Sequence, residues 1–191
     1  MAKTRDIRVI RTQTALLEAL EEILKSKKLS NVTITELCSE ARINRNTFYY
    51  HYNNIFDFLD EHKQIVLDEL SDIPDVSETL SKDNLIEIIR CIHRHPHFMN
   101  IGVSQNCDLD FFSQIFETAS KKTSIIMNDT SRKQSSRYKL LSSYCNAGCN
   151  AVLISWIAGG MKEKPEEVAD LIWSASQNGV IKILFPDGND S

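Results

Sequence analysis

The chain has 191 residues, of which 42% are hydrophobic and 25% charged, a composition typical of an ordinary globular protein. No apolar run approaches the roughly 18 residues that cross a bilayer, and acidic residues near the N-terminus argue against a signal peptide, so we expect a cytoplasmic protein that does not span a membrane. The formal net charge of −4 argues, at first, against a partner as acidic as nucleic acid.

The charge is unevenly distributed along the chain. Residues 1–53 carry nine Lys or Arg against six Asp or Glu, a balance of +3, whereas the remainder has a balance of −7. A basic DNA-facing end on an acidic body produces this asymmetry. Four basic residues lie near the N-terminus: Lys3, Arg5, Arg8 and Arg11. These side chains either contact DNA phosphates or the adjacent minor groove, or they are simply solvated.

Two short helices joined by a tight turn are predicted within residues 33–52, after a long first helix over about residues 7–26. Thr33 is placed to N-cap the first short helix, with Glu36 at the spacing of a capping box. Asn44 is placed to N-cap the second. The positions expected to face the core are Ile34, Leu37, Cys38, Ala41, Phe48 and Tyr52.

The outer face of the second short helix carries polar and aromatic side chains that suit a DNA major groove. We expect Arg45 to read a guanine, and Asn46 with Tyr50 to make flanking contacts. For Tyr49, packing between helices is the alternative to a phosphate contact. Helix pairs of this kind also occur in proteins that never bind DNA. The predicted DNA-binding residues are Thr33, Thr35, Asn44, Arg45, Asn46, Thr47, Tyr49, Tyr50 and His51.

The run from Arg8 to Leu59 resembles the DNA-binding domain of the TetR (tetracycline-repressor) family of bacterial transcription regulators. The matching positions are Ala41, Ile43, Asn44, Thr47, Phe48, Tyr49, Tyr52 and residues 53–59. Arg42 replaces the usual turn glycine, so the turn either avoids positive φ or is strained. Ile55 replaces a usual phosphate-binding lysine. The resemblance implies a DNA-binding domain at 1–53 and a helical ligand-sensing and dimerisation domain at 54–191.

Helical periodicity and few Gly and Pro residues predict an all-α protein with about nine helices. A helix over about residues 54–70 is expected to link the two predicted domains. Residues 96–107 are expected to be irregular, because Pro96 breaks the preceding helix. The remaining helices are expected at about residues 81–95, 108–129, 137–158 and 165–177.

The predicted helix at 137–158 is apolar nearly all round, so it must be buried on more than one side. One side would face its own domain and the other a partner subunit. Pro165 is placed to open the last helix. The segment from Trp156 to Glu167 is similar to the C-terminal region of a Gram-positive TetR subgroup that includes dihydroxyacetone-kinase-type activators as well as repressors. This resemblance implies a homodimer through helices 137–158 and 165–177.

The cysteine and histidine spacings do not favour a metal site or a cofactor. The five cysteines include no Cys-x-x-Cys pair, and we expect mostly buried thiols. Cys145 and Cys149 share one helical face, where close packing is favoured over a redox or metal role. His93, His95 and His97 alternate, which does not align three ligands along one helix face.

Together these patterns predict a TetR-type repressor that binds a pseudo-palindromic operator of double-stranded DNA as a homodimer and is released by a small-molecule effector. The alternative is a coactivator-like interaction protein that regulates only with a protein partner. An enzyme is not expected, since no nucleophile elbow, phosphate-binding glycine loop or metal spacing is present. Aromatic and neighbouring residues that could wall an effector pocket, or equally form plain core, are His93, Phe98, Met99, Phe111, Phe112 and Phe116.

Overall fold

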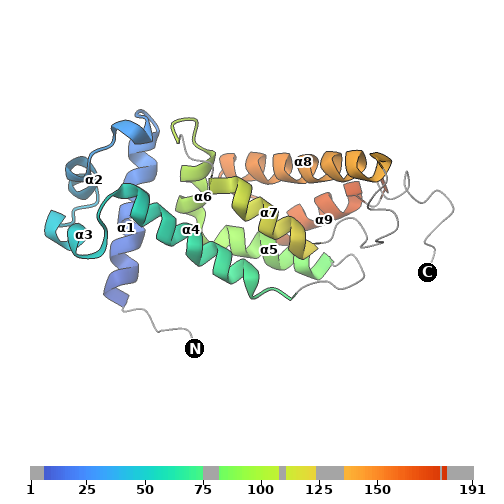
Figure 1. Cartoon of the computed structure of the whole chain (residues 1–191), viewed down its shortest axis with the longest axis horizontal. Coiled ribbons are helices and arrows are strands. Elements are labelled where there is room, and N and C mark those ends of the chain that lie inside the picture. Colours follow the sequence, from blue (N-terminus) through green and yellow to red (C-terminus); the bar gives the residue numbers. More distant parts are fainter. Residues whose placement is uncertain (1–6, 75–81, 108–110, 124–135, 177, 180–191) are drawn as a thin grey trace. The chain divides into compact units, whose positions relative to one another are not determined.

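The computed structural model describes residues 7–74, 82–107, 111–123, 136–176 and 178–179 (Figure 1). All the regular structure in these residues is helical, which confirms the all-α fold class. None of their helices is both long and apolar enough to pass through a bilayer. The elements are α1 (Ile7–Leu24), the 3-10 helix η1 (Leu29–Asn31), α2 (Ile34–Glu40), α3 (Arg45–His51), α4 (Ile55–Ser71), α5 (Lys82–Arg94), α6 (Pro96–Val103), α7 (Phe111–Thr123), α8 (Ser136–Ala158) and α9 (Pro165–Ser176).

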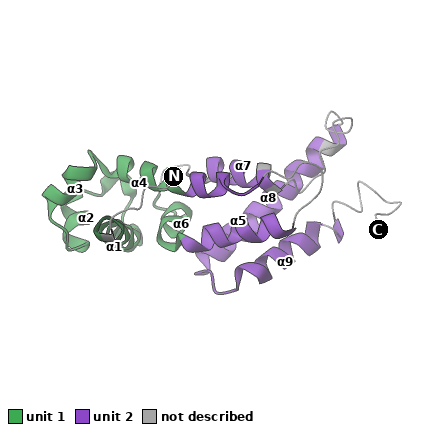
Figure 2. Ribbon diagram, turned by 90° about the horizontal axis from the view of Figure 1, so that it is seen from below, with its two compact units in different colours: residues 1–65, 95–111 green, residues 66–94, 112–191 purple. Residues whose placement is uncertain are grey.

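The chain divides into two compact units, coloured separately in Figure 2. Unit 1 lies within residues 1–65 and 95–111, and unit 2 within 66–94 and 112–191. The boundary therefore falls inside α4, and unit 1 is assembled from two separate stretches of chain. A functional division after residue 53 stays a prediction.

Unit 1 is built around α1, which packs against both α2 and α6. Its inward side chains form a continuous apolar core. The largest fully buried members of unit 1 are Leu16, Leu20, Leu24, Leu37, Phe48, Phe58, Leu59 and Phe98. A buried polar contact accompanies this core, because Gln13 Nε2 donates to the Tyr52 hydroxyl oxygen at 2.8 Å. Since buried polar groups must be paired, this bond fixes the Tyr52 ring at the end of α3.

The expectation that residues 96–107 are irregular was wrong, because α6 occupies Pro96–Val103. Pro96 stands in the first turn of that helix, where its missing N–H leaves no intrahelical bond unmade. The proline therefore begins a new helix as well as ending the preceding one. Phe98, Met99 and Ile101 of α6 are buried.

Polar contacts join α6 and the residues after it to α1. His97 Nδ1 lies 2.7 Å from Glu21 Oε2, and Asn100 Nδ2 donates to Glu21 Oε1 at 2.9 Å. Asn106 Nδ2 donates to the Leu24 carbonyl oxygen at 2.8 Å, which satisfies an acceptor at the C-terminal end of α1. These bonds explain why residues 95–111, which are distant from α1 in the sequence, belong to the same unit as α1.

In unit 2, the apolar faces of α5 and α9 pack together. The buried residues of these two helices include Leu85, Ile88, Ile89, Ile92, Val168, Ala169 and Ile172. Arg90 Nη2 lies 2.6 Å from Glu166 Oε1, and Lys82 Nζ lies 2.8 Å from Asp170 Oδ1. Such exposed pairs contribute little, so the apolar contacts supply most of the stabilisation. Helix α9 begins at Pro165, as the sequence predicts.

The remaining sequence expectations for unit 2 are met in part. Helix α7 covers Phe111–Thr123, within the predicted helix at 108–129. Residues 108–110 and 124–129 lie outside the described residues. Helix α8 ends in a turn where the Met161 N–H donates to Trp156 O at 2.9 Å, with Gly160 at φ 84°. This left-handed position favours glycine, which explains why the helix ends there.

Candidate nucleic-acid interface and the α8–α9 surface

The start of α2 has the Thr33 N-cap that the sequence predicts. Thr33 Oγ1 accepts from the Glu36 N–H at 3.2 Å. A further contact was not predicted: Lys27 Nζ lies 2.6 Å from Glu36 Oε2. This bond with Lys27 is the main reason that the pKa of Glu36 is lowered. The loop after α1 is thereby tied to the first turn of α2.

The turn between α2 and α3 adopts the strained alternative. Arg42 has a φ of 55°, in the left-handed region. The Ile43 N–H donates to Cys38 O at 2.9 Å, and the Arg42 N–H donates to Ser39 O at 3.2 Å, which is the bond pattern of a Schellman motif. A residue with a Cβ pays about 1–2 kcal/mol in that conformation. The side chain of Arg42 is exposed beside α3, and it is a basic residue that the predicted site omits.

Helix α3 is capped at its start and anchored by aromatic packing at its inner face. Asn44 Oδ1 accepts from the Asn46 N–H at 2.8 Å, as predicted. Phe48 is 0% exposed and Tyr52 6%. The Tyr52 ring centroid lies 5.5 Å from that of Phe48 and 5.1 Å from that of Phe58 in α4. This cluster leaves the opposite face of α3 directed to solvent.

All nine predicted DNA-binding residues are exposed, which is a condition for the role and not a test of it. Tyr50 is 83% exposed and Tyr49 48%. The Arg45 guanidinium carbon lies 5.9 Å from the centre of the Tyr49 ring, within the range of a cation–π contact. Tyr49 also meets the ring of its α3 neighbour Phe48 edge-on at 5.9 Å. This contact lies within one helix, so packing between helices stays the alternative to a phosphate contact.

The start of α4 supplies no phosphate ligand at the position where the family usually has lysine. The side chain of Ile55 is 6% exposed and belongs to the core of unit 1. Its neighbours form a cap: Asn54 Oδ1 accepts from the Asp57 N–H at 2.9 Å, and Asn53 Nδ2 donates to Asp57 Oδ2 at 2.8 Å. Asp57 therefore holds both amide side chains next to the end of α3.

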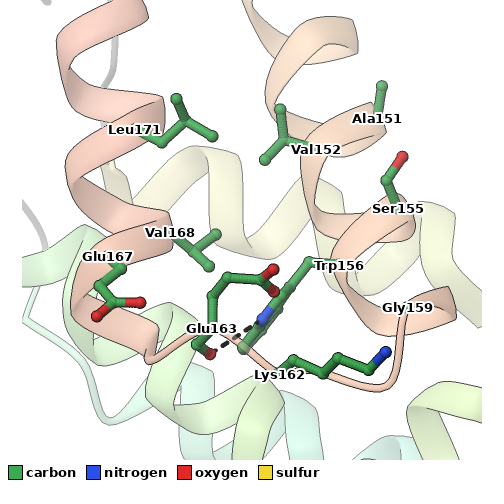
Figure 3. Close-up of a pocket in the computed structure, with 10 residues that line it drawn as sticks. All are labelled: Ala151, Val152, Ser155, Trp156, Gly159, Lys162, Glu163, Glu167, Val168 and Leu171. Carbon is green, nitrogen blue, oxygen red and sulfur yellow. Dashed lines mark hydrogen bonds between the residues drawn. The ribbon is translucent and has the colours of Figure 1, made fainter.

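A groove of about 650 Å³ lies between α8 and α9 in unit 2 (Figure 3). Val168 and Leu171 project from α9 toward Val152 of α8, with Trp156 at the base of the groove. The indole N–H of Trp156 donates to the Glu163 carbonyl oxygen at 3.2 Å, which fixes the corner between the helices. The remaining lining residues are Ala151, Ser155, Gly159, Lys162 and Glu167.

Large apolar side chains of this helix pair are exposed to solvent. Leu140 is 69% exposed, Tyr144 72% and Ile154 40% on α8, and Leu171 is 60% exposed on α9. On the same α8, Leu153 and Ile157 are buried. The predicted all-round apolar character therefore corresponds to one side packed in unit 2 and another side uncovered. We refer to α8, α9 and these exposed residues as the α8–α9 surface.

The residues considered as effector-pocket walls have different positions. Phe98 and Met99 are buried in the core of unit 1, and Phe116 is buried in unit 2. The side chains of Phe111 and Phe112 lie outside the described part of the structure. Two hollows among the described residues are lined instead by α8, α9 and the corner between them, a feature that the sequence did not indicate.

Comparison with known proteins decides the family. A TetR family model described as "Transcriptional regulator C-terminal region" matches residues 81–178, just over half of the chain. The chain belongs to the TetR family. This TetR regulator is similar to a Bacillus subtilis (strain 168) protein titled "Uncharacterized HTH-type transcriptional regulator YxbF", with 20% identity over 166 residues. The match covers 82% of this chain but only 42% of that relative, so the chain spans less than half of its length.

A solved structure shares the fold of this TetR regulator. The dihydroxyacetone kinase operon activator DhaS superposes with a TM-score of 0.52 at 21% identity, covering 90% of this chain and 97% of that one. Lin0861 from Listeria innocua gives a TM-score of 0.48 at 19% identity, covering 93% and 96%. The resemblance of residues 8–59 predicts the TetR family. The family model, which matches residues 81–178 in a different part of the chain, confirms this prediction.

Proposed function

We propose that this TetR regulator binds a pseudo-palindromic DNA operator as a homodimer, with α3 of each protomer in one of two successive major grooves. The exposed polar face of α3 carries the proposal, because Phe48 and Tyr52 anchor the other face in the core. An arginine, an asparagine and tyrosines then point outward from one short helix. These side chains can contact both base edges and phosphates.

The proposed contacts divide into two classes. Arg45 reads a guanine, and Asn46 and Tyr50 make flanking contacts with bases or backbone. The phosphate class fixes the position of the protein on the duplex and comprises Thr33, Thr35, Tyr49 and His51. Thr33 and Asn44 already use their side-chain oxygens as helix caps, so they support the orientation of α2 and α3 rather than base recognition.

The α8–α9 surface supports the proposed dimer. Burial of a large apolar side chain contributes about 1.5–3 kcal/mol, and a twofold interface counts each contact twice. Leu140, Tyr144 and Leu171 are all more than half exposed in the single protomer. A second copy that covers them and fills the groove gains this energy.

The proposed direction of regulation is repression, relieved by an effector bound in the C-terminal domain. Such an effector changes operator occupancy only by the difference between its affinities for the DNA-bound and DNA-free states. We assign no residue to the effector.

A footprint and a gel-shift series in rising salt, with purified full-length protein on its upstream DNA, test the proposal. We expect two protected half-sites one helical turn apart, and an affinity for the site that falls linearly with salt on logarithmic axes. Scrambled DNA of equal length is the control, and a promoter reporter gives the direction of regulation. DNA binding that requires a second protein would contradict the proposal and favour the coactivator-like alternative.

A further inference from the structure

A second hollow on the α8–α9 surface, with a volume of about 170 Å³, contains two thiols. Cys145 and Cys149 lie one turn apart on α8, and Ser176 reaches the hollow from the end of α9. No lining residue carries a carboxylate, imidazole, ammonium or guanidinium group, so sulfur is the strongest metal ligand in this hollow. The other lining residues are Tyr144, Gly148, Val152, Ile172 and Ala175.

The polar atoms of the hollow form one connected group. Cys145 Sγ lies 3.6 Å from Ser176 Oγ. Ser176 Oγ donates its only proton to the Ile172 carbonyl oxygen at 2.9 Å. The lone pairs of this hydroxyl oxygen therefore face the Cys145 thiol. Cys145 is buried and Cys149 half-buried. Two sulfur atoms and one hydroxyl oxygen thus meet where two helices approach each other.

Each of the two thiols alters the pKa of the other. A hydrogen bond from Cys149 lowers the pKa of Cys145, whereas the same contact together with burial raises the pKa of Cys149. Cys91 differs, because burial and Glu69 raise its pKa to about 12 and keep it protonated. Cys91 also lies outside the hollow, so the pair on α8 supplies its sulfur ligands.

We propose that Cys145 and Cys149 bind one monovalent copper ion, Cu(I), with Ser176 Oγ as a weak third ligand. Thiolates select soft ions such as Cu(I). Structural zinc sites take four ligands, and this hollow supplies two sulfur atoms and one oxygen. Both cysteines bind as thiolates, so the incoming ion displaces the thiol protons into solvent and no electron is transferred.

An ion bridge suits the intact helix better than a disulfide does. Side chains four residues apart on a helix have Cβ atoms about 5–6 Å apart. A disulfide requires about 3.5–4.5 Å between these atoms. Helix α8 is continuous from Ser136 to Ala158, so oxidation of the pair to a disulfide would distort it. An ion between the two sulfur atoms requires no such approach.

The test is an anaerobic titration of the reduced full-length protein with Cu(I), against a chromophoric Cu(I) chelator. We expect a tight site in which Cys145→Ala and Cys149→Ser each weaken binding by about 100-fold or more, since even loss of a supporting residue weakens metal sites by up to about 100-fold. Cys107→Ser, which changes a half-buried thiol of unit 1, is the matched control and should leave the affinity unchanged.

Two results would overturn the assignment. One is wild-type Cu(I) affinity in the variants of both cysteines; the other is Zn(II) binding as tight as Cu(I) binding at the same residues. Circular dichroism verifies folding, and if the buried Cys145→Ala variant fails to fold, Cys149→Ser decides the question alone. No DNA is present, so a negative result would leave the proposed operator binding untouched.

Discussion

The outer face of α3 and the α8–α9 surface both present large side chains to solvent, but of opposite chemical character. On α3 the exposed group is an arginine with asparagine, threonine and tyrosine around it. On α8 and α9 the exposed group includes Leu140, Ile154 and Leu171. Exposed polar side chains are hydrated until a charged partner replaces the bound water. Exposed leucine side chains, in contrast, cost free energy as long as they are in contact with water. The first surface suits a transient nucleic-acid contact, and the second a permanent protein contact.

The strongest test of this difference is a charge placed on the apolar surface. Leu171→Asp is expected to raise the dimer dissociation constant by about 100-fold or more, because the twofold interface loses two buried leucines and gains two unpaired charges. Analytical ultracentrifugation over a range of concentrations measures it. Ser174→Asp introduces the same charge at an exposed position on α9 that lines neither hollow, and should leave the dimer intact. If both variants remain dimeric, the interface lies elsewhere.

A smaller effect is expected on the polar surface. Arg45→Ala should weaken binding to the cognate operator by about 1–3 kcal/mol and relax specificity at one base pair. Competition binding with operators substituted base by base measures both changes. An equal loss on every sequence would show that Arg45 contacts a phosphate, and the assignment of guanine recognition would then be wrong.

Removal of a helix cap should lower the free energy of unfolding by about 1 kcal/mol. Thr33→Ala deletes the oxygen that accepts from the Glu36 N–H, and we expect the free energy of unfolding to fall by about 0.5–2 kcal/mol. Thr35→Ala, at an exposed position two residues further on, should change stability much less. Chemical denaturation of the two variants side by side separates the cap from the general effect of losing a threonine.

The smallest expected change is a gain in stability on substitution of Arg42. Arg42→Gly relieves about 1–2 kcal/mol of left-handed strain, but the extra entropy of the unfolded chain offsets about 0.4–1 kcal/mol of this gain. The net gain in stability is therefore about 0–1.6 kcal/mol. Arg42→Lys retains both the charge and the strain and serves as the control. Weaker operator binding by the glycine variant, with normal binding by the lysine variant, would show that the strain is retained for a contact of this side chain with DNA.

Local rules were enough to predict the helix-turn-helix in detail. The caps at Thr33 and Asn44 depend on residues two or three positions away, and the core positions Phe48 and Tyr52 follow from helical spacing. The strain at Arg42 was open between two alternatives, because a sequence does not give a backbone angle. The nine site residues are exposed as a DNA contact requires, and their role remains a prediction.

Features that depend on distant contacts could not be predicted in the same way. Pro96 is compatible both with an irregular segment and with the first turn of a helix, and the packing of α6 against α1 decides between them. The contact between Lys27 and Glu36 joins the loop after α1 to α2, and the approach of Ser176 to Cys145 joins α9 to α8. Helical spacing alone placed the two cysteines on one face, but it could not reveal the hollow beside them.

The discontinuous make-up of unit 1 limits how this regulator can be dissected or recombined. A fragment ending at residue 53 would lack Phe58 and Leu59 from α4 and all of α6, and so would uncover the part of α1 that packs against α6. Such a fragment is therefore a poor candidate for independent folding. A chimaera built to transplant the proposed operator specificity onto another sensor must carry α6 together with the helix-turn-helix.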